Sequence, residues 1–363
     1  MGFFFSSELR LSLFWFAQNF IGFFLSPLLA QDYALRFFGN GTGDIDRVKI
    51  RIDQPGNPLN VGQNFTIEFR LRGILADNPS GGNVQDGAHD DWTLGHILID
   101  RDIFGSGDYG DFGISLVGGR IAFGVNNGSQ SYTLVGSRFV LDGSWHSVAV
   151  TRSISGSLAI YVDGILDDQA NSSVTGDLSY RIGRSTSWPN DPYLILGAEK
   201  HDYDPSQYPS FRGLLDELRV SSIVRYTSSY VPLSRLSDDS HTVALYHFDE
   251  GSGTFLRNAA ALSGALADGT LRVGGNPAGP VWELVGGSTV LQETRQRADV
   301  SIYPNPAKSL CWIESSAPEL TAFDSIGRRW RKVEPGCIDI SDWPPGFYVL
   351  QGRDGSTPLL ILP

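Results

Sequence analysis

The chain has little methionine, little cysteine and too few basic residues to balance its acidic ones. A single methionine beside 42 glycines and 19 prolines argues against long helices, because helices favour residues such as methionine, while many short strands need frequent turn residues. Lysine and arginine total 28 against 40 aspartates and glutamates, which gives a formal charge of −12. Phosphate backbones repel so acidic a surface, and we therefore expect no nucleic-acid partner.

Motifs of the common catalytic classes are missing as well. The six histidines form no HExxH pair, and no serine lies in a G-x-S-x-G elbow. Gly105–Gly107 and Gly251–Gly253 place glycines around a serine, but neither has the lysine of a phosphate-binding loop. Apolar residues make up 41% and charged residues 19%, which excludes wholesale disorder. We expect a folded protein that is not an enzyme.

The N-terminus carries an apolar, aromatic segment from Leu11 to Ala30, followed by polar residues. This pattern predicts a signal peptide over residues 1–30, cleaved near Ala30, and hence a protein that is secreted or held on the outer cell surface. Gln18 and Asn19 interrupt the apolar run, so an uncleaved membrane anchor stays open as the alternative. No later segment is apolar enough to span a bilayer.

The two cysteines, Cys311 and Cys337, both lie in the last sixth of the chain. In an oxidising compartment they can form a disulfide, which would stabilise the fold by about 3–4 kcal/mol in the entropic view. Two free buried thiols are the alternative. Neither cysteine has the histidine neighbours or the CxxC spacing of a metal or redox site.

Apolar and polar residues alternate with a period of two, which is typical of strands with one solvated face. The clearest runs cover residues 65–72, 112–116, 121–125 and 158–162. Gly118-Gly119 and Asp163-Gly164 are hairpin signals between or after such runs. The pattern predicts an all-β fold, a two-sheet antiparallel jelly-roll sandwich over residues 31–283.

One acidic residue falls on the apolar face of a predicted strand. Asp216 shares its parity with Leu214, Leu218 and Val220, so alternation directs it toward the core. A carboxylate in that place needs hydrogen-bond donors, and we interpret Asp216 as a buried structural acceptor with no catalytic role.

The composition changes after the predicted jelly roll. Residues 284–298 are rich in glycine and polar side chains, which predicts a linker. Residues 299–363 alternate again and predict a small C-terminal β-sandwich. Its core candidates are Ile302, Trp312, Ile338, Ile340, Phe347, Val349 and Leu350.

Five segments in this order resemble the laminin-G-like jelly roll of the concanavalin A-like lectins and glucanases, which is related to the pentraxins. They cover residues 64–69, 144–149, 158–164, 211–220 and 245–253, and the resemblance extends from about Tyr33 to Trp282. The resemblance implies a lectin-like sandwich, and hence a non-catalytic protein that recognises glycans or glycoproteins.

Two acidic loops are candidates for metal binding. Ca²⁺ is held by six to eight oxygens, which loops provide from carboxylates and backbone carbonyls. In pentraxin-like relatives a calcium site joins two loops at such places, which implies Ca²⁺ as a cofactor here. His201 departs from that pattern, because relatives tend to have another acid there. The resemblance proposes as ligands Asp108, Asp111, Glu199, Asp202 and Asp204.

Aromatic residues near these loops are candidates for sugar contact. Flat rings pack against the apolar faces of pyranoses, and loops leave them accessible. Pro189 and Pro192 stiffen the loop around Trp188; the alternative is that Trp188 folds back as a lid. The candidate ligand-binding residues are Tyr109, Trp188, Tyr193, Tyr203 and Tyr208.

Glycoside hydrolases share this fold, but their acid pair is not present in the sequence. Relatives resembling laminarinases carry an E-x-D-x-x-E triplet, which places two glutamates on one face of a strand. No such triplet occurs, and Asp216 and Glu217 are adjacent residues, which face opposite sides of a strand. Two alternatives remain: a structural or adhesion protein with a protein partner, and a polysaccharide-degrading enzyme with an unfamiliar acid pair.

The C-terminal residues resemble the type IX secretion (Por) sorting domain of Bacteroidetes. The likeness rests on Tyr303-Pro-Asn-Pro-Ala307, Asp324-Ser-Ile-Gly-Arg328 and Gly346-Phe-Tyr348. It implies export through the periplasm and recognition of residues 299–363 by the outer-membrane secretion machinery. The last residues, 359–363, lack the basic residue that such tails usually carry.

Overall fold

The computed structural model describes most of the chain in two compact units, which divide between Gly287 and Ser288. The described residues are 32–79, 84–87, 89–103, 110–181, 188–286, 301–303, 307–314, 318–324, 328–351 and 356–362. The predicted signal peptide, residues 1–30, lies outside them. No helix in these ranges is long and apolar enough to cross a membrane.

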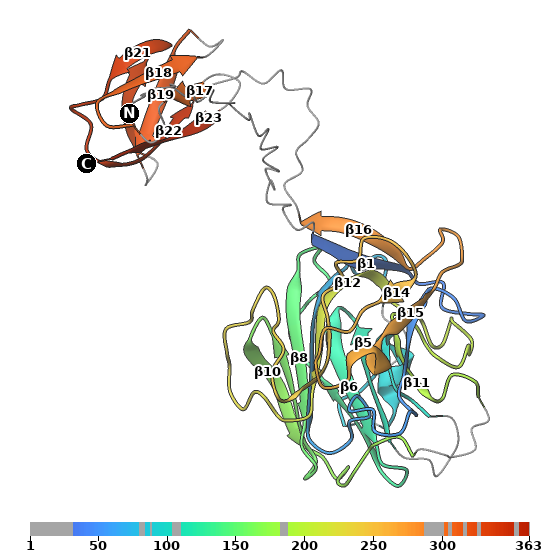
Figure 1. Cartoon of the computed structure of the whole chain (residues 1–363). Coiled ribbons are helices and arrows are strands. Elements are labelled where there is room, and N and C mark those ends of the chain that lie inside the picture. The colour runs from blue at the N-terminus through green and yellow to red at the C-terminus, as the bar shows by residue number, and fades with distance from the viewer. Residues whose placement is uncertain are drawn as a thin grey trace, which may run out of the picture. The chain divides into compact units, whose positions relative to one another are not determined.

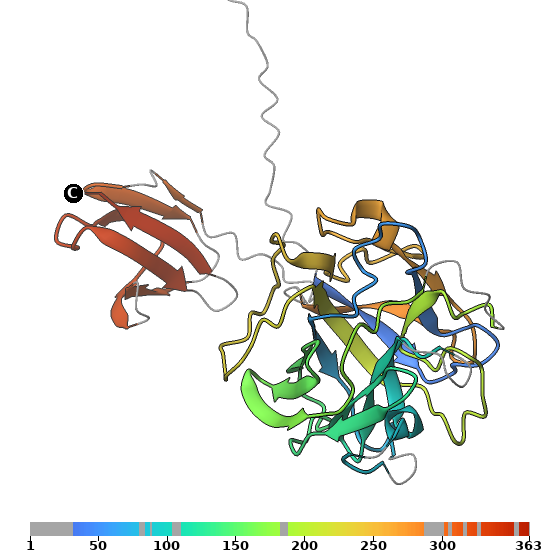
Figure 2. The same cartoon turned by 90° about the horizontal axis from the view of Figure 1, so that it is seen from below.

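The first unit is a sandwich of two antiparallel sheets (Figure 1, Figure 2), which confirms the predicted all-β fold class. The first sheet has the order β10 (Ile165–Asn171), β9 (Ser157–Val162), β8 (His146–Arg152), β3 (Phe65–Arg72), β12 (Arg212–Ser221), β1 (Asp32–Phe38) and β16 (Val281–Gly286), with β13 (Thr242–Tyr246) also paired to β12. The second has the order β14 (Phe255–Leu256), β15 (Gly269–Arg272), β2 (Arg47–Arg51), β11 (Tyr193–Leu196), β4 (His96–Asp100), β5 (Asp111–Val117), β6 (Arg120–Asn126) and β7 (Ser131–Val135).

The core lies between the two sheets and follows the alternation of the sequence. Phe65, Ile67 and Phe69 of β3 point inward and pack with Ile114 and Phe123 of the opposite sheet. Burying a large apolar side chain stabilises the fold by roughly 1.5–3 kcal/mol, so this cluster dominates the stability of the unit.

A second, smaller cluster covers the other face of the second sheet. Trp92, in the short 3₁₀ helix η1 (Asp91–Leu94), is 1% exposed and lies against Gly113 of β5 and Gly124 of β6. These glycines are paired across the two strands. A Cβ atom at Gly124 would lie 1.8 Å from Trp92 Cδ1, so only glycine leaves room for the indole.

The structure corrects the face predicted for Asp216. Leu215, Leu218 and Val220 face the core, and the register of β12 shifts between Asp216 and Arg219. Glu217 has a φ of 47° at this irregularity, which breaks the strict alternation on which the prediction relied. Asp216 therefore lies on the other face. It is 1% exposed there and accepts a hydrogen bond from Arg70 at 3.3 Å, as a buried acceptor.

The jelly roll also extends further than predicted. Leu284 and Gly286 of β16 pair with Tyr33 and Asp32 of β1, so residues 284–286 belong to the first sheet and not to a linker. They complete a strand that begins at Val281, inside the predicted domain.

The second unit contains two small antiparallel sheets. One has the order β17 (Ser301–Tyr303), β18 (Leu310–Glu314), β21 (Gly336–Asp339), and the other β20 (Arg329–Val333), β19 (Leu320–Asp324), β22 (Gly346–Gln351), β23 (Ser356–Ile361). Ile313, Ile340 and Leu350 are among its buried residues. Trp312, predicted in this core, is 43% exposed, because it alternates with the buried Cys311 and Ile313.

The predicted disulfide between Cys311 and Cys337 is wrong, because neighbouring residues of a strand alternate between its two faces. Cys311 is paired with Ile338, and Cys337 with Trp312. Because residues directly opposite each other share a face, the two thiols lie on opposite faces of the sheet. Cys311 is buried, Cys337 is exposed, and both are free.

Candidate functional site

The candidate site is formed by the loop that follows β11, together with the end of β4. Gly197 begins the loop with a φ of +85°, and a Cβ atom there would lie 2.1 Å from the ring of Phe37. Glycine is therefore required for the chain to turn at this point. The turn directs the next residues inward, where Glu199, Lys200 and His201 are 4%, 0% and 2% exposed.

His201 is the centre of a buried group of carboxylates. Its Nε2 atom lies 2.9 Å from Asp191 Oδ1, and its Nδ1 atom lies 3.4 Å from Asp102 Oδ2 and 3.5 Å from Glu199 Oε1. Burial opposes the charge, but hydrogen bonds to Asp102, Asp191 and Glu199 raise the pKa of His201 to about 11. The side chain is therefore a buried imidazolium at neutral pH.

Glu199 closes the turn around this histidine. Its carboxylate accepts the backbone N–H of His201 at 2.7 Å and that of Tyr203 at 3.0 Å. Burial would raise the pKa of Glu199, but the bonds from His201 and Tyr203 lower it. The carboxylate is thus ionised and already bonded to the loop that carries it.

Asp100 and Lys200 fix the loop to the sheet. Asp100 accepts the backbone N–H of Asp102 at 2.8 Å and that of Lys200 at 3.1 Å. Lys200 Nζ donates to the carbonyl oxygens of Asp191 and Tyr193 at 3.2 and 2.9 Å. Burial raises the pKa of Asp100 to about 7 and lowers that of Lys200. These contacts hold the site rigid before any ligand arrives.

A row of aromatic rings lies beside His201. The ring centroids of Trp188 and Tyr203 are 5.8 Å apart, and those of Tyr203 and Tyr208 are 5.6 Å apart. The His201 ring lies 5.9 Å from Trp188 and 6.1 Å from Tyr203. All three aromatic side chains are half-buried, so each packs against the protein and is still partly accessible to solvent. We call Trp188, Tyr203 and Tyr208 the aromatic row.

The remaining predicted residues are not brought together with Glu199. Asp202 has a φ of 60° and pairs with Arg47 at 2.6 Å. Asp204 accepts hydrogen bonds from Ser206 in an exposed turn. Tyr193 lies under the Lys49 ammonium, 4.6 Å from its ring centroid. Asp108 and Tyr109 lie outside the described residues.

Asp111, the first residue of β5, is buried and lies near enough to Asp102 and Lys200 to interact with their charges. Its Oδ1 atom has no hydrogen-bond partner among the described residues. Burial, and then the charge of Asp102, raises the pKa of Asp111 well above its ordinary value.

Among the described residues the predicted calcium ligands form no single cluster, and with Asp108 outside them the calcium site stays a prediction. Within the described ranges, no group of three or more acidic, histidine or cysteine side chains could hold a metal ion. Both carboxylate oxygens of Glu199 accept backbone N–H groups, Asp202 Oδ1 pairs with Arg47, and Asp204 Oδ1 accepts from Ser206. Asp100, Asp102 and Asp191 were not among the predicted ligands, although the Asp100-Arg-Asp102 sequence is a visible acidic signal.

Residues 88–228 match the family model of laminin-G type that is described as the concanavalin A-like lectin/glucanases superfamily. The jelly roll is similar to this superfamily. The match supports the first resemblance found in the sequence. No curated protein matches the chain.

Solved structures of similar fold come from several organisms. A putative carbohydrate-binding protein from Bacteroides ovatus is 15% identical with a TM-score of 0.42, over 71% of this chain and 61% of that one. A heptameric SAP-like pentraxin from Limulus polyphemus is 13% identical with a TM-score of 0.36, over 55% and 79%. The CBM40 of the Ruminococcus gnavus IT-sialidase, bound to α2,3-sialyllactose, is 14% identical with a TM-score of 0.36, over 55% and 94%.

Proposed function

We propose that the first unit is a non-catalytic domain that binds glycans or glycoproteins at the aromatic row. The observation that carries this proposal is the geometry of Trp188, Tyr203 and Tyr208, three half-buried rings spaced 5.6–5.8 Å apart beside a fixed cation. Rings offer a large apolar surface at little entropic cost, and the C–H faces of sugars pack against such surfaces. The lectin-like family match over residues 88–228 supports the same function.

The bonding of the acidic residues supports a binding role over catalysis. A glycosidase needs two carboxyl groups, about 5–5.5 Å or 6.5–9.5 Å apart, that can reach the scissile bond. At this site Asp100 and Glu199 each accept two backbone N–H groups. Carboxylates engaged in this way position the loop and are poorly placed to transfer protons to a ligand.

A glycan array probed with the full chain tests the proposal. We expect bound glycans, and a three- to tenfold loss of affinity, about the free energy of one aromatic contact, for Trp188→Ala and for Tyr203→Ala. Trp145→Ala is the matched control. Trp145 is also half-buried, but it contacts Arg70 and Arg72 of β3 in the first sheet.

The outcomes separate the alternatives. Unchanged binding by Trp188→Ala would place the ligand elsewhere. An array without signal, together with capture of a surface protein, would favour an adhesion role. Release of reducing ends from a polysaccharide, abolished by one carboxylate substitution, would make the protein an enzyme.

We also propose that the protein is exported and acts outside the cell. The N-terminal apolar segment and the C-terminal resemblance to sorting domains support this localisation, with the outer-membrane secretion machinery as the partner of residues 299–363. Deletion of residues 299–363 in a strain that has this machinery should leave the protein in the periplasm. Unchanged delivery to the surface would contradict the role of this domain.

A further inference from the structure

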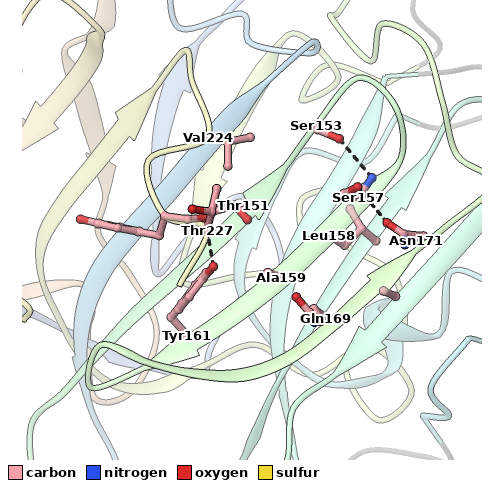
Figure 3. A pocket seen from close by; sticks show the side chains of 12 residues that line it. Thr151, Ser153, Ser157, Leu158, Ala159, Tyr161, Gln169, Asn171, Val224 and Thr227 are labelled. Atoms are coloured by element: carbon pink, nitrogen blue, oxygen red, sulfur yellow. Dashed lines mark hydrogen bonds between the residues drawn. The ribbon is translucent and has the colours of Figure 1, made fainter. Parts of the chain in front are cut away.

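A groove of about 340 Å³ lies on the outer face of the first sheet, away from the aromatic row. Figure 3 shows its walls, with strands β8–β10 on one side and the segment around Val224 and Thr227 on the other. Its volume falls at the lower end of the range for small-molecule sites, about 300–1,000 Å³. Its lining includes Thr151, Ala159, Tyr161, Gln169, Tyr226 and Thr227.

The register of three strands produces the floor of the groove. Ala159 of β9 is paired with Thr151 of β8 on one side and with Gln169 of β10 on the other. Paired residues share a face, and their neighbours Val150 and Ile160 lie in the core, so this row faces outward. Its side chains are short at the centre, which leaves a hollow where a larger residue would fill the space.

The wall of the groove is held in place by aromatic contacts. The Tyr161 hydroxyl donates to the carbonyl oxygen of Tyr226 at 3.0 Å. The rings of Tyr226 and Tyr230 stack, and Tyr161 lies 5.8 Å from each. Tyr230 N–H also donates to Gly164 at 2.7 Å. The segment is therefore tied to β9 and the turn after it, and the groove is preformed.

The lining carries hydrogen-bonding groups but no charge. Ser157 donates to Asn171 Oδ1 at 2.9 Å. Within the described residues, the side chains of Thr151, Gln169 and Thr227 make no hydrogen bond with the protein. Hydroxyl and amide groups both donate and accept, which is the pattern that sugar hydroxyl groups require.

We propose that this groove is a second saccharide site, specific for an uncharged sugar. An ionised ligand such as a sialylated or sulfated sugar would lose hydration here without gaining a counter-charge. A purely apolar ligand would leave Gln169, Thr151 and Thr227 without partners. A neutral sugar satisfies these groups and presents its C–H face to the half-buried ring of Tyr226. The site does not depend on the aromatic row.

Saturation-transfer NMR with the full chain tests this proposal. The probes are the methyl glycosides of glucose, galactose, mannose and N-acetylglucosamine, with sialic acid methyl glycoside as the charged comparison. We expect a signal from at least one neutral glycoside. Gln169→Ala should weaken its binding about three- to tenfold, because one hydrogen bond is lost. Ala159→Leu should abolish the signal by filling the floor.

Two controls keep the result interpretable. Gln130→Ala changes another exposed glutamine, which lies in the turn between β6 and β7 of the second sheet. This variant should leave binding unchanged. The measurements are repeated in the Trp188→Ala background to separate the two sites, because a signal that persists there and is lost on adding Ala159→Leu comes from the groove. An unaltered melting temperature shows that Ala159→Leu is folded. No neutral signal, a stronger signal from the sialoside, or loss of binding only in Trp188→Ala would overturn the proposal.

Discussion

His201 Nε2 lies 2.9 Å from Asp191 Oδ1, and both side chains are buried at the base of the aromatic row. Removing one partner of such a pair leaves an uncompensated charge in the interior. We therefore expect His201→Gln to lower the free energy of unfolding by about 3–5 kcal/mol at neutral pH, measured by urea denaturation. His146→Gln is the control. His146 bonds to Asp142 and Asp163 at the surface, so its loss should cost less than about 1 kcal/mol.

The same pair predicts a pH dependence. Because the pKa of His201 rises from 6.5 to about 11 on folding, its contribution to stability is complete below about pH 6.5. That contribution decreases as the pH rises through this interval and is lost above about pH 11. The ring signals of His201 should show no titration from about pH 6 to pH 9 in NMR spectra. A midpoint near the ordinary histidine value would contradict the buried ion pair.

Glu199 should act as a structural residue, whether or not calcium is present. Its two backbone hydrogen bonds are charge-assisted, so Glu199→Gln should cost about 1.5–3 kcal/mol. We expect an equal decrease in melting temperature with calcium and with a chelator. The resemblance implies another acid at the position of His201. His201 instead supplies a positive charge among three carboxylates, which is the electrostatic role that a metal ion would have. A calcium-dependent stabilisation that Glu199→Gln removes would contradict this purely structural role and support the calcium prediction.

Asp216 should destabilise the fold as it ionises. Burial, and then the charges of Glu217 and Asp32, raise its pKa from 3.8 to about 8. Between these values the unfolded chain releases a proton that the folded chain keeps, so stability falls as the pH rises. Asp216→Asn removes the charge and should raise the free energy of unfolding by about 1–3 kcal/mol near pH 8.

Comparing the unmodified protein with the Asp216→Asn variant at low pH provides the control. Near pH 4 both the carboxyl group and the amide are uncharged, and the difference in stability should largely disappear. A benefit of the same size at both pH values would mean that Asp216→Asn acts through packing and not through charge.

Alternation in the sequence was enough to predict the sandwich, because burial of one face selects every second residue. Alternation gave the wrong face for Asp216, because the strand is irregular there. Glu217 has a φ of 47°, and the register shift beside it places Asp216 on the other face. Alternation also could not show that Cys311 and Cys337 are offset by one position between neighbouring strands. Register is a property of pairing between distant segments, which no local pattern contains.

The candidate site was predicted only in part for a related reason. Glu199, Trp188, Tyr203 and Tyr208 are recognisable from loop composition. The charge of His201 depends on Asp102 and Asp191, which come from two other segments of the chain. The groove was missed entirely, since small and uncharged residues such as Ala159 and Gln169 carry no motif. Only the pairing of β8, β9 and β10 places them in one row.

Trp92 and Gly124 provide a test of the packing on the outer face of the second sheet. Gly124→Ala brings a methyl group to within 1.8 Å of Trp92 Cδ1, so the indole must move. We expect a loss of about 1–3 kcal/mol, the usual cost of overpacking. In the background Trp92→Leu the same substitution should cost much less, because the clash is gone. A double-mutant cycle by chemical denaturation measures this coupling. Additive effects would show that Trp92 does not lie on the glycine pair.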